Sequence, residues 1–145
     1  MRSDLVIRPL GQQDRALILS SNAFDGPAHK SNTDDFLKDL RHLIVGAIIG
    51  DELIGFASGV VQLHPDKTPT LFVSEVGVNE SYQREGIATR LVTALIDLGR
   101  VQGCVGVWVA TEDDNIPARR LYDRLGGRET QGIVVYDWGG VMDDG

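Results

Sequence analysis

A six-residue stretch, residues 83–88, has the residue types of a phosphate-binding loop and reads Gln83-Arg84-Glu85-Gly86-Ile87-Ala88. A strand-like run over residues 71–78 leads into it, and an amphipathic helical pattern follows it. Gly86 and the small Ala88 let a ligand approach the backbone closely, while the free N–H groups and positive dipole end of the following helix attract phosphate oxygens. The sequence therefore predicts a pyrophosphate site at this strand-to-helix junction.

The elements around this loop follow from turn signals and hydrophobic periodicity. Gly50-Asp51 is a two-residue turn signal between apolar runs at residues 43–49 and 53–63, which predicts an antiparallel hairpin. Residues 70–78 return as a third strand of the same sheet. After the loop, apolar residues recur at helical spacing and predict a helix that packs onto the sheet and ends near Gly103: Ile87, Leu91, Ala94, Leu95 and Leu98.

The remaining elements are shorter and are indicated by the same signals. In chain order they are a strand, two helices, a strand, a helix and a last strand, at residues 5–7, 13–24, 33–40, 105–110, 116–125 and 133–138. Thr33 suits the N-cap of the second helix, and Pro117 suits the first turn of the last one. This order predicts an α/β (α+β) fold with a mixed sheet.

Length and composition favour one globular domain spanning residues 1–145. Hydrophobic residues make up 42% of the chain and charged residues 24%, a balance typical of folded proteins. Apolar runs are far shorter than the ~20 residues that span a bilayer, and no long apolar segment follows the N-terminus. We therefore expect a cytoplasmic protein with no membrane partner. The single Cys104 cannot form an internal disulfide, which suits a reducing compartment.

Charge and motif content exclude several function classes. Fourteen basic and 21 acidic side chains give a formal charge of −7, which argues against a nucleic-acid partner. An acidic protein attracts a cationic substrate, although acidity also serves solubility alone. His29, His42 and His64 are scattered without metal-ligand spacing, so we expect no metal. The chain lacks the Gly-x-Ser-x-Gly elbow and the Gly-x-x-x-x-Gly-Lys phosphate loop of the commonest rival chemistries.

Residues 83–88 match the Gln/Arg-x-x-Gly-x-Gly/Ala signature, and by this motif and its element order the chain resembles the GCN5-related N-acetyltransferases (GNAT superfamily). The resemblance implies a GNAT fold, with a mixed, mostly antiparallel sheet of six to seven strands and about four helices. It implies a cofactor-binding core at about residues 70–127. The glycine-rich end, about residues 139–145, is expected to be a flexible tail.

The resemblance also implies acetyl-coenzyme A as cosubstrate and assigns residues to it. The backbone of residues 83–89 would hold the pyrophosphate, and the backbone of Val76 and Val78 would pair with the pantetheine arm like an added strand. Asn115 and Ala118 would flank the far end of that arm. The implied cofactor-binding set is Val76, Val78, Gln83, Arg84, Glu85, Gly86, Ile87, Ala88, Thr89, Asn115, Ala118 and Tyr122.

Acetyl transfer to an amine needs a base for the amine and an acid for the departing thiolate. The resemblance places the Tyr122 hydroxyl at the thioester sulfur as the acid; otherwise Tyr122 is a core aromatic completing its helix face. Glu75 is the first candidate base because it lies on the strand that presents the acetyl group, with its side chain on the face opposite Ser74 and Val76. An exposed or paired strand glutamate is the alternative.

The acceptor half carries a narrower likeness. Residues 24–27, the proline-containing loop after the hairpin and the loop at 83–89 look like the type I aminoglycoside 3-N-acetyltransferases, whose substrates are polycationic sugars. Four carboxylates would line the acceptor cleft, Asp25, Glu75, Asp113 and Asp137, although Asp137 also suits a solvated edge strand. Ser74-Glu75 departs from the aromatic and aspartate typical of that group.

The expected function is transfer of acetyl to a primary amine by direct attack, on the 3-amino group of an aminoglycoside. Three alternatives stay open: an acceptor that is a peptide N-terminus, a lysine or a polyamine; a catalytically silent acyl-coenzyme A sensor; and, for assembly, a homodimer in place of a monomer. The apolar side chains of residues 133–138 would suit such a dimer interface.

Overall fold

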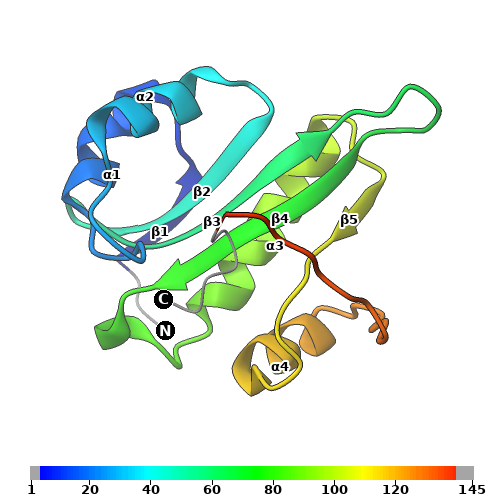
Figure 1. The fold of residues 1–145 in the computed structure, drawn as a ribbon. Coiled ribbons are helices and arrows are strands. Elements are labelled where there is room, and N and C mark those ends of the chain that lie inside the picture. Colours follow the sequence, from blue (N-terminus) through cyan, green and yellow to red (C-terminus); the bar gives the residue numbers. More distant parts are fainter. Residues whose placement is uncertain (1–3, 140–145) are drawn as a thin grey trace.

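A computed structural model describes residues 4–139 and contains one five-stranded sheet in the order β1-β2-β3-β4-β5 (Figure 1). The strands are β1 (Leu5–Pro9), β2 (His42–Ile49), β3 (Glu52–Gln62), β4 (Thr70–Val78) and β5 (Gly106–Trp108). The first four strands pair antiparallel with their neighbours, and β5 pairs parallel with β4. The expected α/β class and mixed sheet are confirmed.

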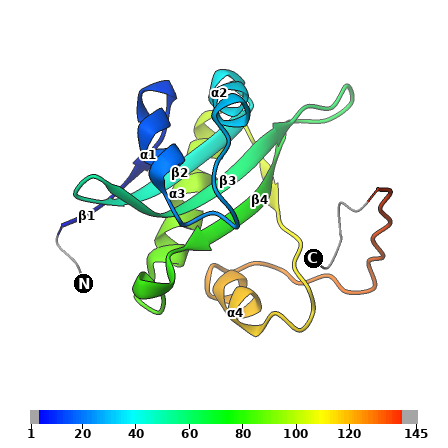
Figure 2. The ribbon, with the colours of Figure 1, turned by 60° about the vertical axis from the view of Figure 1, so that its left-hand side comes forward.

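Helices cover both faces of this sheet (Figures 1 and 2). On one face lie α1 (Arg15–Ser20) and α2 (Lys30–Lys38), and on the other lies α3 (Ile87–Val101). The remaining helix, α4 (Ile116–Arg124), follows β5, and two short 3-10 turns occupy η1 (Gln12–Asp14) and η2 (Glu80–Tyr82). Within residues 4–139, no helix combines the length and apolar character needed to cross a bilayer.

The main core lies between α3 and the sheet. The apolar stripe of α3 supplies Ile87, Leu91 and Leu95, all buried against side chains of β2, β3 and β4. A Cβ added at Gly99 would lie 2.9 Å from Leu71, so a small residue is needed where the helix crosses β4. A smaller cluster centred on Ile18 packs α1 and α2 on the other face. The predicted docking of this helix onto the sheet is confirmed.

The expected hairpin is also confirmed. β2 and β3 pair from His42 opposite Val60 to Ile49 opposite Glu52, and Gly50 makes the turn with φ +62°. A left-handed backbone at this position favours glycine, and this explains why Gly50-Asp51 is a good turn signal. The third strand, residues 70–78, has the predicted bounds.

A β-bulge in β4 determines which face of the sheet the side chain of Glu75 occupies. Ser58 of β3 lies opposite Glu75, but Gly59 lies opposite Val73, which leaves Ser74 as the extra residue. Because side chains alternate along a strand, one extra residue reverses which face the following side chains occupy. Val73 before the bulge and Val76 after it therefore face the same α3 core, and Glu75 faces away from that core.

Several sequence predictions are wrong. The last strand, residues 133–138, is absent: these residues form no strand and pair with no strand of the described chain, so the sheet has five strands instead of six to seven. The second helix begins at Lys30, and its N-cap is His29; Thr33 is buried inside the helix. The first helix is shorter than predicted. The predicted tail, apart from Gly139, lies outside the described residues.

Candidate functional site

The loop between β4 and α3 is exposed at residues 83–86 and leads into the first turn of α3. Arg84 has φ +65° and Gly86 has φ +78°, two left-handed residues that turn the chain sharply into α3. No side chain caps the start of α3, so its first N–H groups are available to a ligand. A Cβ at Gly86 would meet nothing within 4 Å, and this leaves open space above the loop. These features fit a diphosphate.

The neighbouring side chains hold this loop in place. The Gln83 amide donates to the Val78 carbonyl (Nε2–O 3.1 Å), which ties the loop to the end of β4. Ile87 is buried in the core and anchors the first turn of α3, while Ala88 and Thr89 are half-buried. Arg84 and Glu85 have exposed side chains. The sequence-predicted cradle therefore consists mainly of backbone groups whose orientation the fold sets.

β4 and β5 separate as they run (Figure 1). β5 pairs with β4 only at residues 70–72, opposite residues 106–108. Beyond Phe72, β4 has β3 as its only strand neighbour in the described chain, and Val76 and Val78 lie in this unpaired part. Apart from the Val78 carbonyl, which accepts from Gln83, backbone groups on the β5 side of this stretch have no strand partner and can pair with an extended ligand arm. This unpaired edge leads to the loop that precedes α3.

Helix α4 carries the three remaining residues implied for the cofactor. Asn115 is the N-cap, and its side-chain oxygen accepts from the Ala118 N–H (3.2 Å). Tyr122 is half-buried, and desolvation raises the pKa of its hydroxyl above the ordinary value. A tyrosine with a raised pKa keeps its proton at neutral pH and can donate it. No described contact joins α4 residues to Glu75, so the structure leaves the roles of Tyr122, Asn115 and Ala118 as predictions.

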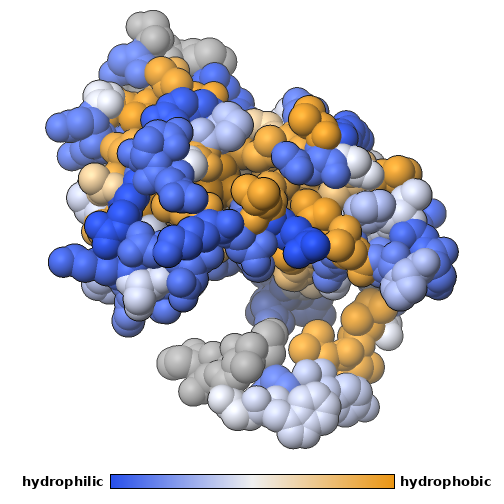
Figure 3. All heavy atoms as spheres, turned by 90° about the horizontal axis from the view of Figure 1, so that it is seen from above, coloured by the Kyte–Doolittle hydropathy of each residue, from blue (hydrophilic) through white to orange (hydrophobic). Residues whose placement is uncertain are grey.

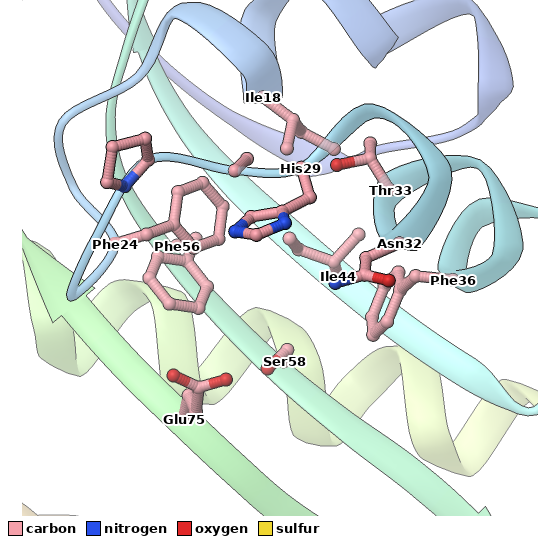
Figure 4. Close-up of a pocket in the computed structure, with 12 residues that line it drawn as sticks. Ile18, Phe24, His29, Asn32, Thr33, Phe36, Ile44, Phe56, Ser58 and Glu75 are labelled. Atoms are coloured by element: carbon pink, nitrogen blue, oxygen red, sulfur yellow. The ribbon is translucent and has the colours of Figure 1, made fainter.

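On the opposite side of the sheet from α3, a cavity of about 250 Å³ opens beside Glu75 (Figure 4). Ring contact between Phe24 and Phe56, with centroids 4.2 Å apart, forms one wall. Ser21 anchors the loop that carries Phe24, because its hydroxyl donates to the Leu53 carbonyl (2.6 Å). The lining residues are Ile18, Phe24, Pro27, Ala28, His29, Asn32, Thr33, Phe36, Ile44, Phe56, Ser58 and Glu75.

Glu75 is the one carboxylate among the described residues that lines this cavity, and it points into the cavity from β4 (Figure 4). Its side chain remains exposed at the mouth. Desolvation first and the negative charge of Asp25 second raise the pKa of Glu75 above its usual range. A carboxylate with a raised pKa is better suited to take a proton from an ammonium group than an ordinary surface glutamate.

The four carboxylates predicted for the acceptor cleft are not all brought together. Asp25 lies close enough to Glu75 to act on it electrostatically. Asp113 lies in the loop before α4, where its backbone carbonyl accepts from Arg119 (Nη1–O 2.8 Å). Asp137 is exposed in the segment after α4. Neither Asp113 nor Asp137 lines the cavity.

Sequence reasoning missed most of the cavity wall. His29, Asn32 and Phe36 come from α2 and the residue before it, and Phe56 and Ser58 come from β3. Phe56 and Ser58 share a face by the two-residue period of a strand, which is the one signal that could have found them. Within residues 4–139, no three His, Cys, Asp or Glu side chains are grouped to hold a metal ion.

Comparisons with known proteins agree with this geometry. Residues 15–127 match the Acetyltransferase (GNAT) family. The chain is 32% identical over 85 residues to an L-2,4-diaminobutyric acid acetyltransferase of Marinococcus halophilus, covering 59% of this chain and 48% of that protein. It is 26% identical over 115 residues to an aminoglycoside N(6')-acetyltransferase type 1 of Salmonella typhimurium, covering 75% of this chain and 78% of that one.

The fold has a close structural counterpart. A solved structure of AAC(6')-Iy in complex with the bisubstrate analogue CoA-S-monomethyl-acetylneamine superposes with a TM-score of 0.79 at 20% identity, covering 94% of this chain and 99% of that one. This confirms the expected GNAT fold, with five strands in the described chain. The chain spans about half or less of the length of the diaminobutyric acid acetyltransferases that it matches.

Proposed function

Because this chain belongs to the acetyltransferase (GNAT) family, we propose that it transfers an acetyl group from acetyl-coenzyme A to a primary amine. One observation carries the proposal. The left-handed residues Arg84 and Gly86 turn the chain into the uncapped start of α3, which follows the end of β4, and residues 73–78 of β4 have no β5 neighbour. This arrangement offers a diphosphate site after the end of an open strand edge, and both suit a long thioester that carries phosphates.

The cosubstrate supplies a thioester carbonyl and a thiolate leaving group when bound. Side chains of the protein then accept the proton of the amine and donate a proton to the leaving group. Glu75, with its raised pKa, holds the acceptor's ammonium group at the cavity mouth and takes its proton, directly or through a water. Tyr122 keeps its own proton at neutral pH and donates it to the leaving sulfur. The backbone N–H of Val76 or Val78 is the proposed oxyanion donor.

For the acceptor, we propose an amine of an aminoglycoside. The relatives named as aminoglycoside N(6')-acetyltransferases support this class and make the 6'-amino group the first position to test, while the 3-amino group stays the position expected from the sequence. The arrangement of the cavity suggests how such a substrate would bind. Its apolar walls would contact the faces of one sugar ring, and Glu75 with nearby Asp25 would hold the reacting ammonium group.

A smaller amine is the second candidate. The cavity has one lining carboxylate and a wall of aromatic and aliphatic side chains, which suits an amine on a short or apolar frame. Relatives named as L-2,4-diaminobutyric acid acetyltransferases and as N-alpha-acetyltransferase 30 point to an amino acid and to a peptide N-terminus as test compounds. A lysine side chain and polyamines complete the set.

The test is an acetyl-transfer assay on a panel of amines. Purified protein with acetyl-coenzyme A is offered aminoglycosides with and without a 6'-amino group, polyamines, diaminobutyric acid and peptides, and free thiol is measured. We expect turnover of aminoglycosides, and mass spectrometry of the product assigns the acetylated position. Turnover of peptides or diaminobutyric acid alone would replace the acceptor proposed here.

Binding of coenzyme A is measured separately by calorimetry. A protein that binds coenzyme A but turns over no amine would support the sensor alternative, whereas a folded protein that binds none would overturn the proposed function itself. Glu75→Gln serves as the control for turnover, because it removes the proposed base and leaves the α3 cradle in place.

A further inference from the structure

Two buried hydroxyl groups line the cavity beside Glu75. Ser58 of β3 is 5% exposed and Thr33 of α2 is 7% exposed, and both residues belong to the cavity wall. Within residues 4–139, neither hydroxyl forms a hydrogen bond, and neither oxygen is closed off from the cavity. Folded proteins pair nearly all of their buried polar groups, so two unpaired hydroxyls in one cavity indicate a ligand that pairs with them.

Ser58 lies next to the proposed base. In the β3–β4 ladder Ser58 is directly opposite Glu75, and side chains in that relation have Cβ atoms about 4.5–5.5 Å apart. Glu75 is exposed at the mouth of the cavity, whereas Ser58 is buried further in (Figure 4). An ammonium group held at Glu75 therefore brings the neighbouring atoms of the same molecule to the Ser58 hydroxyl.

Thr33 reaches the cavity from the helix layer, whereas Ser58 and Glu75 reach it from the sheet (Figure 4). The rings of Phe24 and Phe56 form an apolar wall of the same cavity. Polar groups from two layers and an apolar wall suit a ring whose faces are apolar and whose edge carries hydroxyl groups. A sugar ring has this distribution of polar and apolar surface.

The cavity wall is held in place by the sheet. β3 is paired with β2 on one side and with β4 on the other, so the backbone of Ser58 is fixed. The loop that carries Phe24 packs directly on β4, because a Cβ added at Gly77 would lie 2.5 Å from the Ala23 carbonyl oxygen. A preformed cavity loses little conformational freedom when a ligand binds, so its polar groups can discriminate between similar ligands.

The size of the cavity limits how much of a ligand enters it. A volume of about 250 Å³ corresponds to roughly eight water molecules at about 30 Å³ each, which is room for one six-membered ring. The rest of a larger acceptor would lie outside the cavity. Seen from above, the molecule has open space between its body and its C-terminal part (Figure 3).

We propose that the cavity selects acceptors whose amine is carried by a hydroxylated ring, with Ser58 bonding a hydroxyl next to the amine and Thr33 bonding one across the ring. This inference rests on the proposed function, because it assumes that the amine lies at Glu75. Each hydroxyl can donate or accept, so it can pair with a ligand hydroxyl in either direction. A hydrocarbon ring of the same size would leave both unpaired, and such a mismatch weakens binding.

Three matched ring amines test the selection. They are cyclohexylamine, its analogue with a hydroxyl group on the neighbouring carbon, and its analogue with a hydroxyl group on the opposite carbon. All three are cations at neutral pH. Their dissociation constants are measured by ligand-observed NMR in the presence of coenzyme A. We expect each amino alcohol to bind about tenfold more tightly than cyclohexylamine.

Two variants assign each preference to one hydroxyl. Ser58→Ala should remove the preference for the neighbouring hydroxyl, and Thr33→Val should remove the preference for the opposite one. Because neither hydroxyl has a partner in the described protein, both variants should keep or raise the melting temperature. Ser31→Ala is the control: Ser31 is exposed on α2 and does not line the cavity, so both preferences should remain.

Several results would overturn this selection. These are equal affinities for the three amines, no binding of any of them, or preferences that survive both substitutions. A lower melting temperature for Ser58→Ala and Thr33→Val would show that the hydroxyls serve the fold instead. The acetyltransferase proposal has a separate readout: equal affinities with acetyl transfer would uphold it, whereas selective binding without acetyl transfer to any amine would contradict it and leave the selection standing.

Discussion

Glu75 shows how much the chemistry of one side chain depends on a single extra residue in a strand. Strict alternation from Val73 would direct Glu75 into the core against α3. The bulge at Ser74 instead turns it towards the cavity lined by Phe56 and Ser58. There, partial burial and the charge of Asp25 raise its pKa, so the carboxyl group becomes a stronger base than an ordinary glutamate.

We predict an acid limb in the pH profile that belongs to Glu75. The base must be deprotonated to act, so kcat/KM should fall as pH drops through a pKa that lies above the usual glutamate value. Glu75→Gln should abolish this limb and lower kcat/KM about 10²- to 10⁴-fold. Asp25→Asn should move the limb to lower pH, because it removes a negative charge that raises the pKa of Glu75.

The control for this profile is Glu52→Gln in the β2–β3 hairpin, which removes an exposed glutamate without touching the cavity. It should reproduce the unsubstituted profile. An acid limb that persists in Glu75→Gln would assign the base to another group.

Tyr122 permits a second test at the residue scale. Tyr122→Phe removes the proton donor and keeps the half-buried ring, so we expect kcat to fall about 10²-fold while the affinity for coenzyme A changes little. The measurements are steady-state kinetics and calorimetry. Tyr136→Phe, at an exposed tyrosine beyond α4, is the matched control and should keep full activity. Equal kcat in the two variants would show that Tyr122 only packs the inner face of α4.

At the scale of elements, the loop before α3 works through backbone conformation. Arg84 is non-glycine with φ +65°, a conformation that costs an L-residue free energy and is often kept at functional sites. Together with Gly86 it turns the chain into the start of α3, which no side chain caps, and the position of a Cβ at Gly86 lies in open space. The following turn is held by buried Ile87, so the site stands on the same packing that holds the helix to the sheet.

We therefore predict that Gly86→Ala weakens coenzyme A binding. The added Cβ strains the left-handed backbone by about 1–2 kcal/mol and occupies the open space above the loop. The affinity should fall about tenfold or more by calorimetry, since ~1.4 kcal/mol corresponds to a factor of ten.

Gly50→Ala is a close control for this substitution. Gly50 also has a left-handed backbone, φ +62°, with open space around its Cβ position, but it lies in the β2–β3 turn. Both variants should lose similar stability to heat, and only Gly86→Ala should lose affinity. A similar loss of affinity in both would mean that general destabilisation, and not the loop, is responsible.

For the whole molecule, the formal charge of −7 sets how charged ligands approach. A polycationic acceptor would be attracted over long range, whereas coenzyme A, an anion, would depend on the backbone donors proposed before α3. We predict that KM for an aminoglycoside rises steeply as salt increases from about 0.01 M to 0.15 M, because the Debye length shortens from about 30 Å to 8 Å. The KM for an amine on an otherwise uncharged frame should change little with salt. A KM for the aminoglycoside that does not change with salt would argue against attraction by the net charge.

Local patterns in the sequence were enough to predict the hairpin, the third strand, the amphipathic helix and the loop at residues 83–88. In each case the signal lies within a few neighbouring residues: a Gly-Asp turn, a two-residue or 3.6-residue period, a glycine before a helix. Such features depend on backbone preferences and on burying one apolar face, which neighbouring residues largely determine. The family resemblance followed from the same loop together with the order of the elements.

Only the tertiary structure decided the rest. The bulge that turns Glu75 into the cavity arises from register between β3 and β4, and Phe24 meets Phe56 across 32 residues of sequence. Residues 133–138 have a strand's composition but form no strand within the described residues, because a strand needs the edge of a partner strand in register, which composition alone does not supply. Sequence periodicity indicates the backbone conformation that a segment prefers. Contacts with residues far away in the sequence determine whether that conformation forms.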